Sequence, residues 1–254
     1  MPILRPRPLV ENTRLAYLGE RMNPAFGLTE KAATQMLRLG NPHGKPNANV
    51  LREVAAAPNF RRTSRGWQID FPADMGEEEA SLYQGPFHQL ARSIHHKTPG
   101  WWANPSANIE LRTNLARRER YLASPIDGAK PEFVWLDASL LPDSSLLVIA
   151  RDDDFTHGIV QSHAFAHWWT RVHSRRTPTL AFESFPFPWP PRTALNALTA
   201  AQEEQRHALA LAARGTDPAK LEAAIAAAYG WPAEQTDAEL LARLVALTDT
   251  RERH

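Results

Sequence analysis

Alternation of apolar and polar side chains is clearest over Trp67–Phe71, and it predicts a half-buried strand there. Short apolar runs at Tyr121–Ala123, Phe133–Asp137 and Leu146–Ala150 predict three further strands. The acidic run Asp152–Asp154 after the last of these predicts a polar turn. The chain should therefore contain a small sheet of mixed or antiparallel strands.

Spacings of three and four residues between apolar positions predict helices around these strands. Thr29 is placed to cap a helix over residues 30–39, and Asp74 with Glu77 resembles a capping box that opens a helix to about residue 84. Pro86 should start another helix, and a longer one should run from Gly158 or Ile159 to Arg171. The segment Phe182–Pro191 holds too many prolines for a continuous helix or a central strand.

The composition changes after Pro191, and the rest of the chain predicts helices alone. The expected helices are Thr193–Arg214, one that Asp217 and Pro218 open and that ends at Tyr229–Gly230, and Asp237–Leu247. We therefore expect an α+β fold in three parts: an extended, proline-rich N-terminal arm (1–28), a domain with a small sheet flanked by helices (29–191), and an all-α tail (192–254).

Composition narrows the class of protein. A 43% hydrophobic content in 254 residues is enough for a sizeable core. The sequence has no apolar run of 18 residues and no apolar segment near Met1, so we expect neither a membrane span nor a secretory signal. Cysteine is absent, which excludes disulfides, cysteine nucleophiles and thiolate metal sites and favours a reducing, cytoplasmic setting.

The net charge is only +1, so the distribution of the charged residues is more informative than their sum. The basic residues are mostly arginine, and they gather in two windows, His88–Tyr121 and Ile159–Ala181, the second of which holds no acid. A GC-rich genome accounts equally well for the arginine excess but not for the clustering. Guanidinium groups suit phosphates and guanine edges, so the windows indicate a nucleic-acid partner.

Several catalytic signatures are missing from the sequence. No two glycines are separated by a single residue, which excludes the usual dinucleotide-binding and kinase glycine loops. The chain also lacks the phosphate-binding loop ending in Gly-Lys-Ser/Thr and the Gly-x-Ser-x-Gly elbow of hydrolases. The sequence therefore gives no catalytic residue.

Four histidines lie between His157 and His173, and His163 and His167 have the i, i+4 spacing of metal ligands on a helix. The residue after His163 is alanine, not the glutamate of zinc proteases, and a third ligand would have to come from elsewhere, such as Asp152–Asp154. We therefore expect polar or stacking histidines, or phosphate donors, and no metal.

Nine segments, taken in order, resemble the C-terminal half of MmeI-like, type IIG and phage-defence adenine-specific DNA methyltransferases, namely the target recognition domain and helical tail. The combination of ARDDD, the following Gly-Ile-Val-Gln-Ser and FESFPFP is the most specific part. The segments are Asn12–Leu18, Asn41–Arg52, Arg61–Phe71, Glu79–Tyr83 with Pro86–Phe87, Arg120–Pro125, Phe133–Asp154, Gly158–His163, Thr177–Thr179 with Phe182–Pro188, and Ala227–Pro232.

The resemblance implies a DNA-reading part without its catalytic half. Such enzymes bind S-adenosylmethionine through a Phe-x-Gly-x-Gly loop and act through an [Asn/Asp]-Pro-Pro-aromatic loop, and neither motif occurs here. We expect a separate specificity subunit rather than an excised piece of a longer chain, working with a catalytic subunit that carries S-adenosylmethionine. Two departures are a shorter loop between Arg171 and Thr177 and a shorter tail between Pro191 and Leu221.

The resemblance implies that this chain binds double-stranded DNA and that the catalytic partner binds the flipped adenine in its active site. The tail would dock the partner, in a restriction-modification or antiviral defence system. Trp101 and Trp102 could stack on bases or pack in the core. The candidate DNA contacts are Arg61, Arg62, Arg65, Trp101, Trp102, Arg112, Arg117, Arg118, Arg120, Ser174, Arg175, Arg176, Thr177 and Thr179.

Two other functions remain open from the sequence. One is a scaffold or regulatory subunit of a defence complex that keeps the fold without reading sequence. The other is a metal-dependent hydrolase that uses the His157–His173 cluster with the acidic run.

Overall fold

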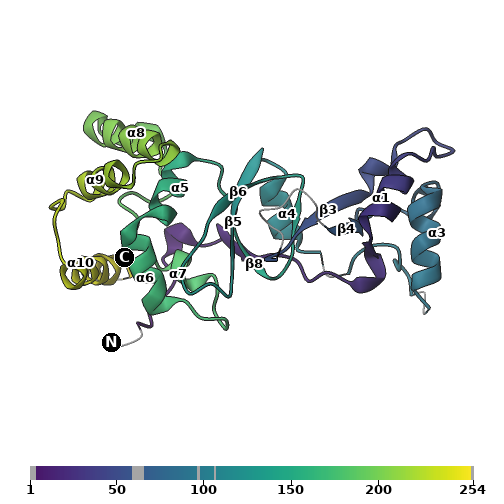
Figure 1. The fold of residues 1–254 in the computed structure, drawn as a ribbon, viewed down its shortest axis with the longest axis horizontal. Helices are drawn as coiled ribbons and strands as arrows, with labels where there is room; N and C mark the ends of the chain where they lie inside the picture. The colour runs from purple at the N-terminus through teal and green to yellow at the C-terminus, as the bar shows by residue number, and fades with distance from the viewer. Residues whose placement is uncertain (1–3, 59–65, 96–97, 106, 253–254) are drawn as a thin grey trace. The chain divides into compact units, whose positions relative to one another are not determined.

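The computed structural model describes residues 4–58, 66–95, 98–105 and 107–252 (Figure 1). The fold is α+β, as the sequence predicts, and the described residues contain ten α-helices and two four-stranded sheets. The chain divides into two compact units. Unit 1 comprises Met1–Leu18, Arg120–Trp135 and Leu147–His254, and unit 2 comprises Gly19–Glu119 and Leu136–Leu146.

Unit 1 contains most of the first sheet. Its strands lie in the order β1 (Ala16–Leu18), β8 (Leu146–Ile149), β5 (Arg120–Pro125) and β6 (Val134–Asp137). β1 and β8 are antiparallel, with Ala16 opposite Ile149. All four residues of β8 are buried, which explains why its sequence is continuously apolar rather than alternating.

Two helices follow β8 where the sequence predicts one. α5 (Asp154–Gln161) begins earlier than expected, because Asp153 caps it by accepting a hydrogen bond from the Thr156 backbone N–H. Ser162 then ends α5 and caps α6 (His163–Val172) through its side chain. Its extended backbone (φ −70°, ψ 157°) breaks the helix, and hydrophobic periodicity alone does not reveal such a break.

The tail helices α8 (Ala200–Arg214), α9 (Pro218–Tyr229) and α10 (Asp237–Arg251) lie beside α5 and α6 (Figure 1). Asp217 caps α9, and Gly230 ends it in the left-handed conformation, as the sequence predicts. The expected helix over Thr193–Arg214 begins only at Ala200, where Thr199 and Gln202 form a capping box.

Gly158 allows α5 and α8 to approach closely. A Cβ at this position would lie 2.7 Å from Leu209 Cδ2 and 2.9 Å from Ala213 Cβ. The buried residues Leu209, Ala213 and Leu244 place the tail in the same core as the sheet. The boundary expected at residue 191 therefore does not separate two cores.

The proline-rich segment completes this core. It begins within α7 (Leu180–Glu183). Phe182, Phe185 and Phe187 are fully buried, and Phe187 packs edge to face on each of the other two. The chain before β1 lies against the same segment: Asn12, in the short 3₁₀ helix Val10–Asn12, donates hydrogen bonds to the carbonyls of Phe182 and Phe185. Part of the expected N-terminal arm is thus an element of the core.

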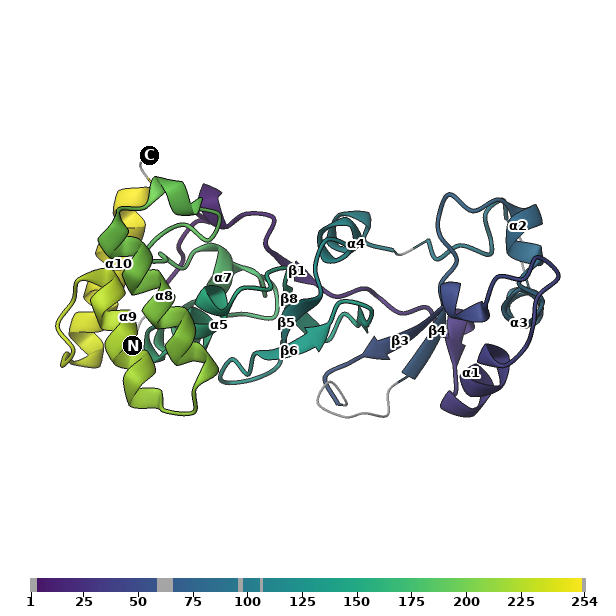
Figure 2. The same ribbon diagram turned by 90° about the horizontal axis from the view of Figure 1, so that it is seen from above.

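Unit 2 holds the second sheet, ordered β2 (Gly27–Leu28), β4 (Gly66–Ile69), β3 (Leu51–Ala55) and β7 (Leu141–Pro142). β3 is antiparallel to β4 and parallel to β7. Its helices are α1 (Glu30–Leu37), α2 (Glu77–Ser81), α3 (Gln84–Ser93) and α4 (Ile109–Leu115). Both views show α1 and α3 side by side (Figures 1 and 2).

The helix caps and the strand that the sequence predicts in unit 2 are confirmed in part. Thr29 caps α1, as expected, but the capping box at Asp74 is wrong, because α2 begins after Gly76 and has no side-chain cap. β4 is present, yet Gln68 and Asp70, on the face expected to be exposed, are buried as well.

Further 3₁₀ helices cover Pro24–Phe26, Asn47–Asn49 and Leu195–Ala197. In the described part of the chain, no helix is both long and apolar enough to span a bilayer.

Candidate nucleic-acid interface

The loop between α6 and α7, residues 173–179, carries the candidate contacts Ser174, Arg175, Arg176, Thr177 and Thr179. His173 fixes its start: the imidazole stacks on Trp169 at 3.8 Å, and Nε2 lies 2.8 Å from the Ile126 carbonyl oxygen. Burial lowers the pKa of His173 below its usual value. The loop is thus anchored at its start by the stacked and hydrogen-bonded imidazole of His173.

The outer part of this loop is polar and exposed. Arg175 pairs with Asp127 at 2.6 Å, but its side chain remains 75% exposed, so water screens the pair. Arg176 is exposed, and no described residue forms an ion pair with it. Ser174 and Thr177 share a 3.0 Å hydrogen bond, and Thr179 donates one to Glu183. The loop therefore presents two accessible guanidinium groups on a defined backbone.

Arg120, at the start of β5, faces a different set of partners within unit 1. It donates to Asp154 at 2.9 Å, and its guanidinium lies 3.9 Å above the Trp135 ring. Arg214 of α8 donates to the other oxygen of Asp154 at 2.6 Å. Asp154 is buried, so this contact joins β5, α5 and α8.

A pocket of about 370 Å³ lies over this contact, and its walls carry charges of both signs. The charges in its lining are largely balanced, because three arginines lie beside an acidic run and a glutamate. These residues are Arg120, Arg206, Arg214, Asp152, Asp153, Asp154 and Glu203. Arg206 also lies over the Phe155 ring at 4.8 Å, and burial lowers its pKa. Mixed charge of this kind suits helix packing better than phosphate binding.

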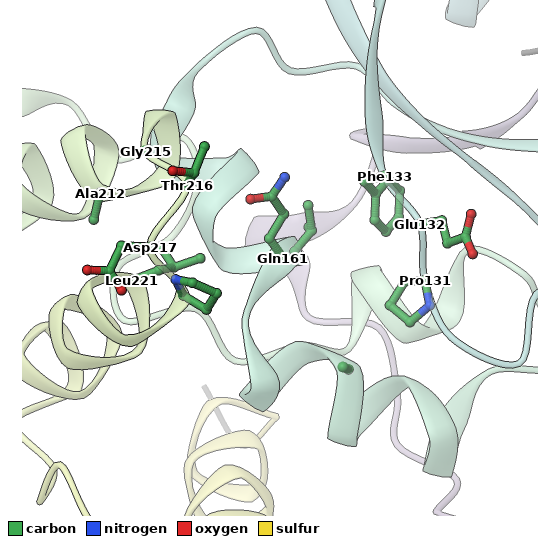
Figure 3. Close-up of a pocket in the computed structure, with 12 residues that line it drawn as sticks. Pro131, Glu132, Phe133, Gln161, Ala212, Gly215, Thr216, Asp217 and Leu221 are labelled. Atoms are coloured by element: carbon green, nitrogen blue, oxygen red, sulfur yellow. The ribbon is translucent and has the colours of Figure 1, made fainter. Parts of the chain in front are cut away.

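Figure 3 shows a second pocket of unit 1, of about 340 Å³. Gln161 stands in its centre, between Pro131 and Glu132 on one side and Thr216 and Asp217 on the other (Figure 3). Its lining includes two carboxylates and no lysine or arginine. An anionic backbone would be repelled here, so this pocket is not part of the candidate interface.

In unit 2, Arg112 of α4 is half-buried and points toward two acidic side chains. It donates two 2.6 Å hydrogen bonds to Glu20 and one of 2.9 Å to Asp70. Burial opposes its charge, but the two carboxylates outweigh this and raise the pKa of Arg112 further above its usual range. Its donors are thus directed at buried acids within the same unit.

The tryptophan pair also faces inward in unit 2. Trp101 is 9% exposed and packs on Phe87, with its indole N–H directed at Glu77. Trp102 is half-buried and donates to the Met75 carbonyl at 2.8 Å. Of the two roles considered, this arrangement matches core packing. Arg117 is exposed after α4, Arg118 donates to the Asn114 carbonyl, and Arg61, Arg62 and Arg65 lie outside the described residues.

The four histidines between His157 and His173 do not meet in one site. His157 contacts Trp135 and Gln161, and His173 faces Ile126. His163 and His167 approach Asp237 of α10 instead of the acidic run Asp152–Asp154. No local pattern predicts this pairing, because α6 and α10 are joined by packing rather than by proximity in the chain.

No protein-family model and no curated protein matches this sequence. A search of solved structures does find a fold likeness. The type IIL restriction-modification enzyme MmeI, solved in complex with DNA, matches with a TM-score of 0.58 at 13% sequence identity. The alignment covers 100% of this chain and 37% of the MmeI chain.

The chain thus has a fold that resembles about a third of a restriction-modification enzyme. At this identity the likeness concerns the fold alone. This fold is of the kind that the sequence resemblance implies. The individual DNA contacts remain predictions, among which the loop 173–179 and Arg117 are both exposed and cationic.

Proposed function

We propose that this chain is a non-catalytic DNA specificity subunit of a split adenine-specific DNA methyltransferase. It would hold double-stranded DNA, and a separate catalytic subunit would supply the S-adenosylmethionine pocket and the reacting groups. The observation that carries the proposal is the fold match to MmeI over the full length of this chain. The ordered sequence motifs point to the same family, and the sequence lacks both methyltransferase loops.

The loop 173–179 supports the DNA-binding part of the proposal. It combines exposed arginines with a backbone anchored by His173, and preorganised donors lose less entropy on binding. Phosphate contacts from such a loop would set the register of the protein on the duplex. Arginines that reach base edges would add sequence discrimination of roughly 1–3 kcal/mol each.

The test combines a methylome with a pull-down. Methylated adenines are sequenced in the native host and in a strain that lacks this chain, and the tagged chain is purified to identify what accompanies it. We expect one methylated motif to disappear and a methyltransferase to co-purify. An unchanged methylome without a co-purifying methyltransferase would overturn the proposal.

Complementation then tests the loop. The deletion strain receives the wild-type chain, the double variant Arg175→Gln/Arg176→Gln, or a control that also removes two exposed cations of unit 1, Arg192→Gln/Lys220→Gln. We expect the motif to return with the wild type and the control and to be weakened or altered with the loop variant. Equal methylation by all three would exclude the loop from DNA recognition and favour a scaffold role.

A further inference from the structure

A compact group of metal-ligating side chains lies within unit 1, between α6 and α10. His163 and His167 stand one turn apart on α6, and Asp237 is the first residue of α10. One ligand atom from each lies within 4.8 Å of the other two. In the described part of the chain, no other three His, Cys, Asp or Glu side chains meet in this way.

The distances suit a shared ion better than a set of direct hydrogen bonds. His163 Nε2 lies 2.8 Å from Asp237 Oδ1, but His167 Nδ1 lies 3.9 Å from Asp237 Oδ2, which is too long for a hydrogen bond. Two ligand atoms bound tetrahedrally to zinc are about 3.3 Å apart. The two separations lie about 0.5 Å below and about 0.6 Å above this value, and all three ligand atoms lie within 4.8 Å of one another.

A direct contact with Asp237 does not explain the position of the His167 side chain. This side chain is only 10% exposed, and Nδ1, the nitrogen that faces Asp237, lies 3.9 Å from the carboxylate. A nine-tenths buried imidazole thus faces a carboxylate that it does not touch.

The backbones that carry the ligands are well defined. Ser162 caps α6, and Thr236 with Glu239 forms a capping box at the start of α10. Glu222 of α9 accepts a 2.7 Å hydrogen bond from the His163 backbone N–H, which adds a second carboxylate near the group. Arg171 opposes a cation here, since its charge acts on both His167 and Asp237.

We propose that His163, His167 and Asp237 bind one divalent transition-metal ion, with zinc as the best match. Two imidazoles and a carboxylate are the ligand types that zinc takes, and water would fill the remaining position. The ion would replace the direct His163–Asp237 contact and join the first turn of α10 to α6. Its role is to fix the tail, and it does not depend on DNA binding or methyl transfer.

The experiment uses the full chain without a histidine tag, freed of metal by a chelator and titrated with Zn²⁺ by calorimetry. Cobalt(II) provides a spectroscopic probe of tetrahedral coordination. His167→Gln is the decisive variant, because it removes a proposed ligand and leaves the His163–Asp237 pair in place. Asp237→Asn tests the carboxylate, and His207→Gln removes an exposed histidine of α8 as the matched control.

We expect one ion per chain in the wild type and the control, and at least tenfold weaker binding in both ligand variants. With Zn²⁺ at about 100 times its Kd, mass action should shift the folding equilibrium about 100-fold and raise the Tm. Absence of saturable binding, or binding that His167→Gln leaves unchanged, would overturn the proposal and leave an ordinary histidine–aspartate pair.

Discussion

Arg112 and Glu20 face each other with their planar groups aligned, so that two guanidinium N–H groups donate to the two carboxylate oxygens at 2.6 Å each. The Glu20 side chain is 1% exposed and that of Asp70, the second partner, is 7% exposed. Removal of the guanidinium would leave two buried carboxylates without a cation. Arg112 is therefore a structural residue of unit 2 in this fold.

Arg112→Gln should accordingly lower the free energy of unfolding by about 3–5 kcal/mol, the usual cost of breaking a buried ion pair from one side. Arg117→Gln is the control, because Arg117 is exposed on the same segment and should change stability by less than about 0.5 kcal/mol. Urea unfolding followed by tryptophan fluorescence measures both. A loss below about 1 kcal/mol for Arg112→Gln would contradict the structural role.

The close approach of α5 and α8 gives a second prediction. Gly158→Ala should destabilise the protein by roughly 1–3 kcal/mol, because the new methyl group would meet Ala213 Cβ and Leu209. Alanine normally favours a helix over glycine, so the expected sign is opposite to that of helix propensity. Gly40→Ala, where a Cβ would meet nothing within 4 Å, is the control. An unchanged or raised Tm for Gly158→Ala would show that the tail packs less tightly than described.

The loop 173–179 predicts a change in the salt dependence of DNA binding. If Arg175 and Arg176 each contact a phosphate, each change to glutamine should reduce the slope of log K against log salt by about 0.9. Fluorescence anisotropy with a duplex, from low to physiological salt, gives the slope. Lys220→Gln is the control for Arg175→Gln, since both cations are exposed and pair with an exposed aspartate of unit 1. An identical slope in all variants would remove these arginines from the phosphate contacts.

His157 predicts how stability depends on pH. Burial lowers its pKa, while Asp154 opposes this effect and Arg120 reinforces it. The unfolded chain therefore binds a proton more readily, so His157 contributes stability above the unfolded pKa of about 6.5. That contribution is lost as the pH falls from about 6.5 through the lower, folded pKa.

The measurement is urea unfolding between pH 7.5 and about pH 5 for the wild type and His157→Gln. The wild type should lose stability over this range, and the variant should lose less of it, because one buried histidine no longer titrates. Parallel curves for the two proteins would show that His157 protonates equally well in the folded and unfolded states.

Local signals in the sequence predict elements better than they predict the partners of side chains. The caps at Thr29 and Asp217 are confirmed because each depends on a few adjacent residues. β3 and α4 were not expected, since Leu51–Ala55 and Ile109–Leu115 have a weak pattern and are stabilised by tertiary packing. The periodicity over 159–171 correctly indicates helix but cannot show the break at Ser162.

In the candidate interface, too, the sequence identifies the charged residues but not their side-chain partners. Charge clustering draws attention to Arg112, Arg120 and Arg175 alike. Their different situations arise from partners that are distant in sequence: Glu20 and Asp70 for Arg112, and Asp154 for Arg120. No spacing rule relates these positions, so sequence reasoning treats a buried ion pair and an exposed cation as equivalent.

The pairing of β1 with β8 sets an order of events during synthesis. Ala16 meets its partner Ile149 only after the ribosome has added about 130 further residues. Until then the first strand has no neighbour, and the tail helices that share its core have not been made. The amino-terminal strand therefore cannot complete its native pairing before β8 has been synthesised, so the core of unit 1 cannot close from the amino-terminal residues alone.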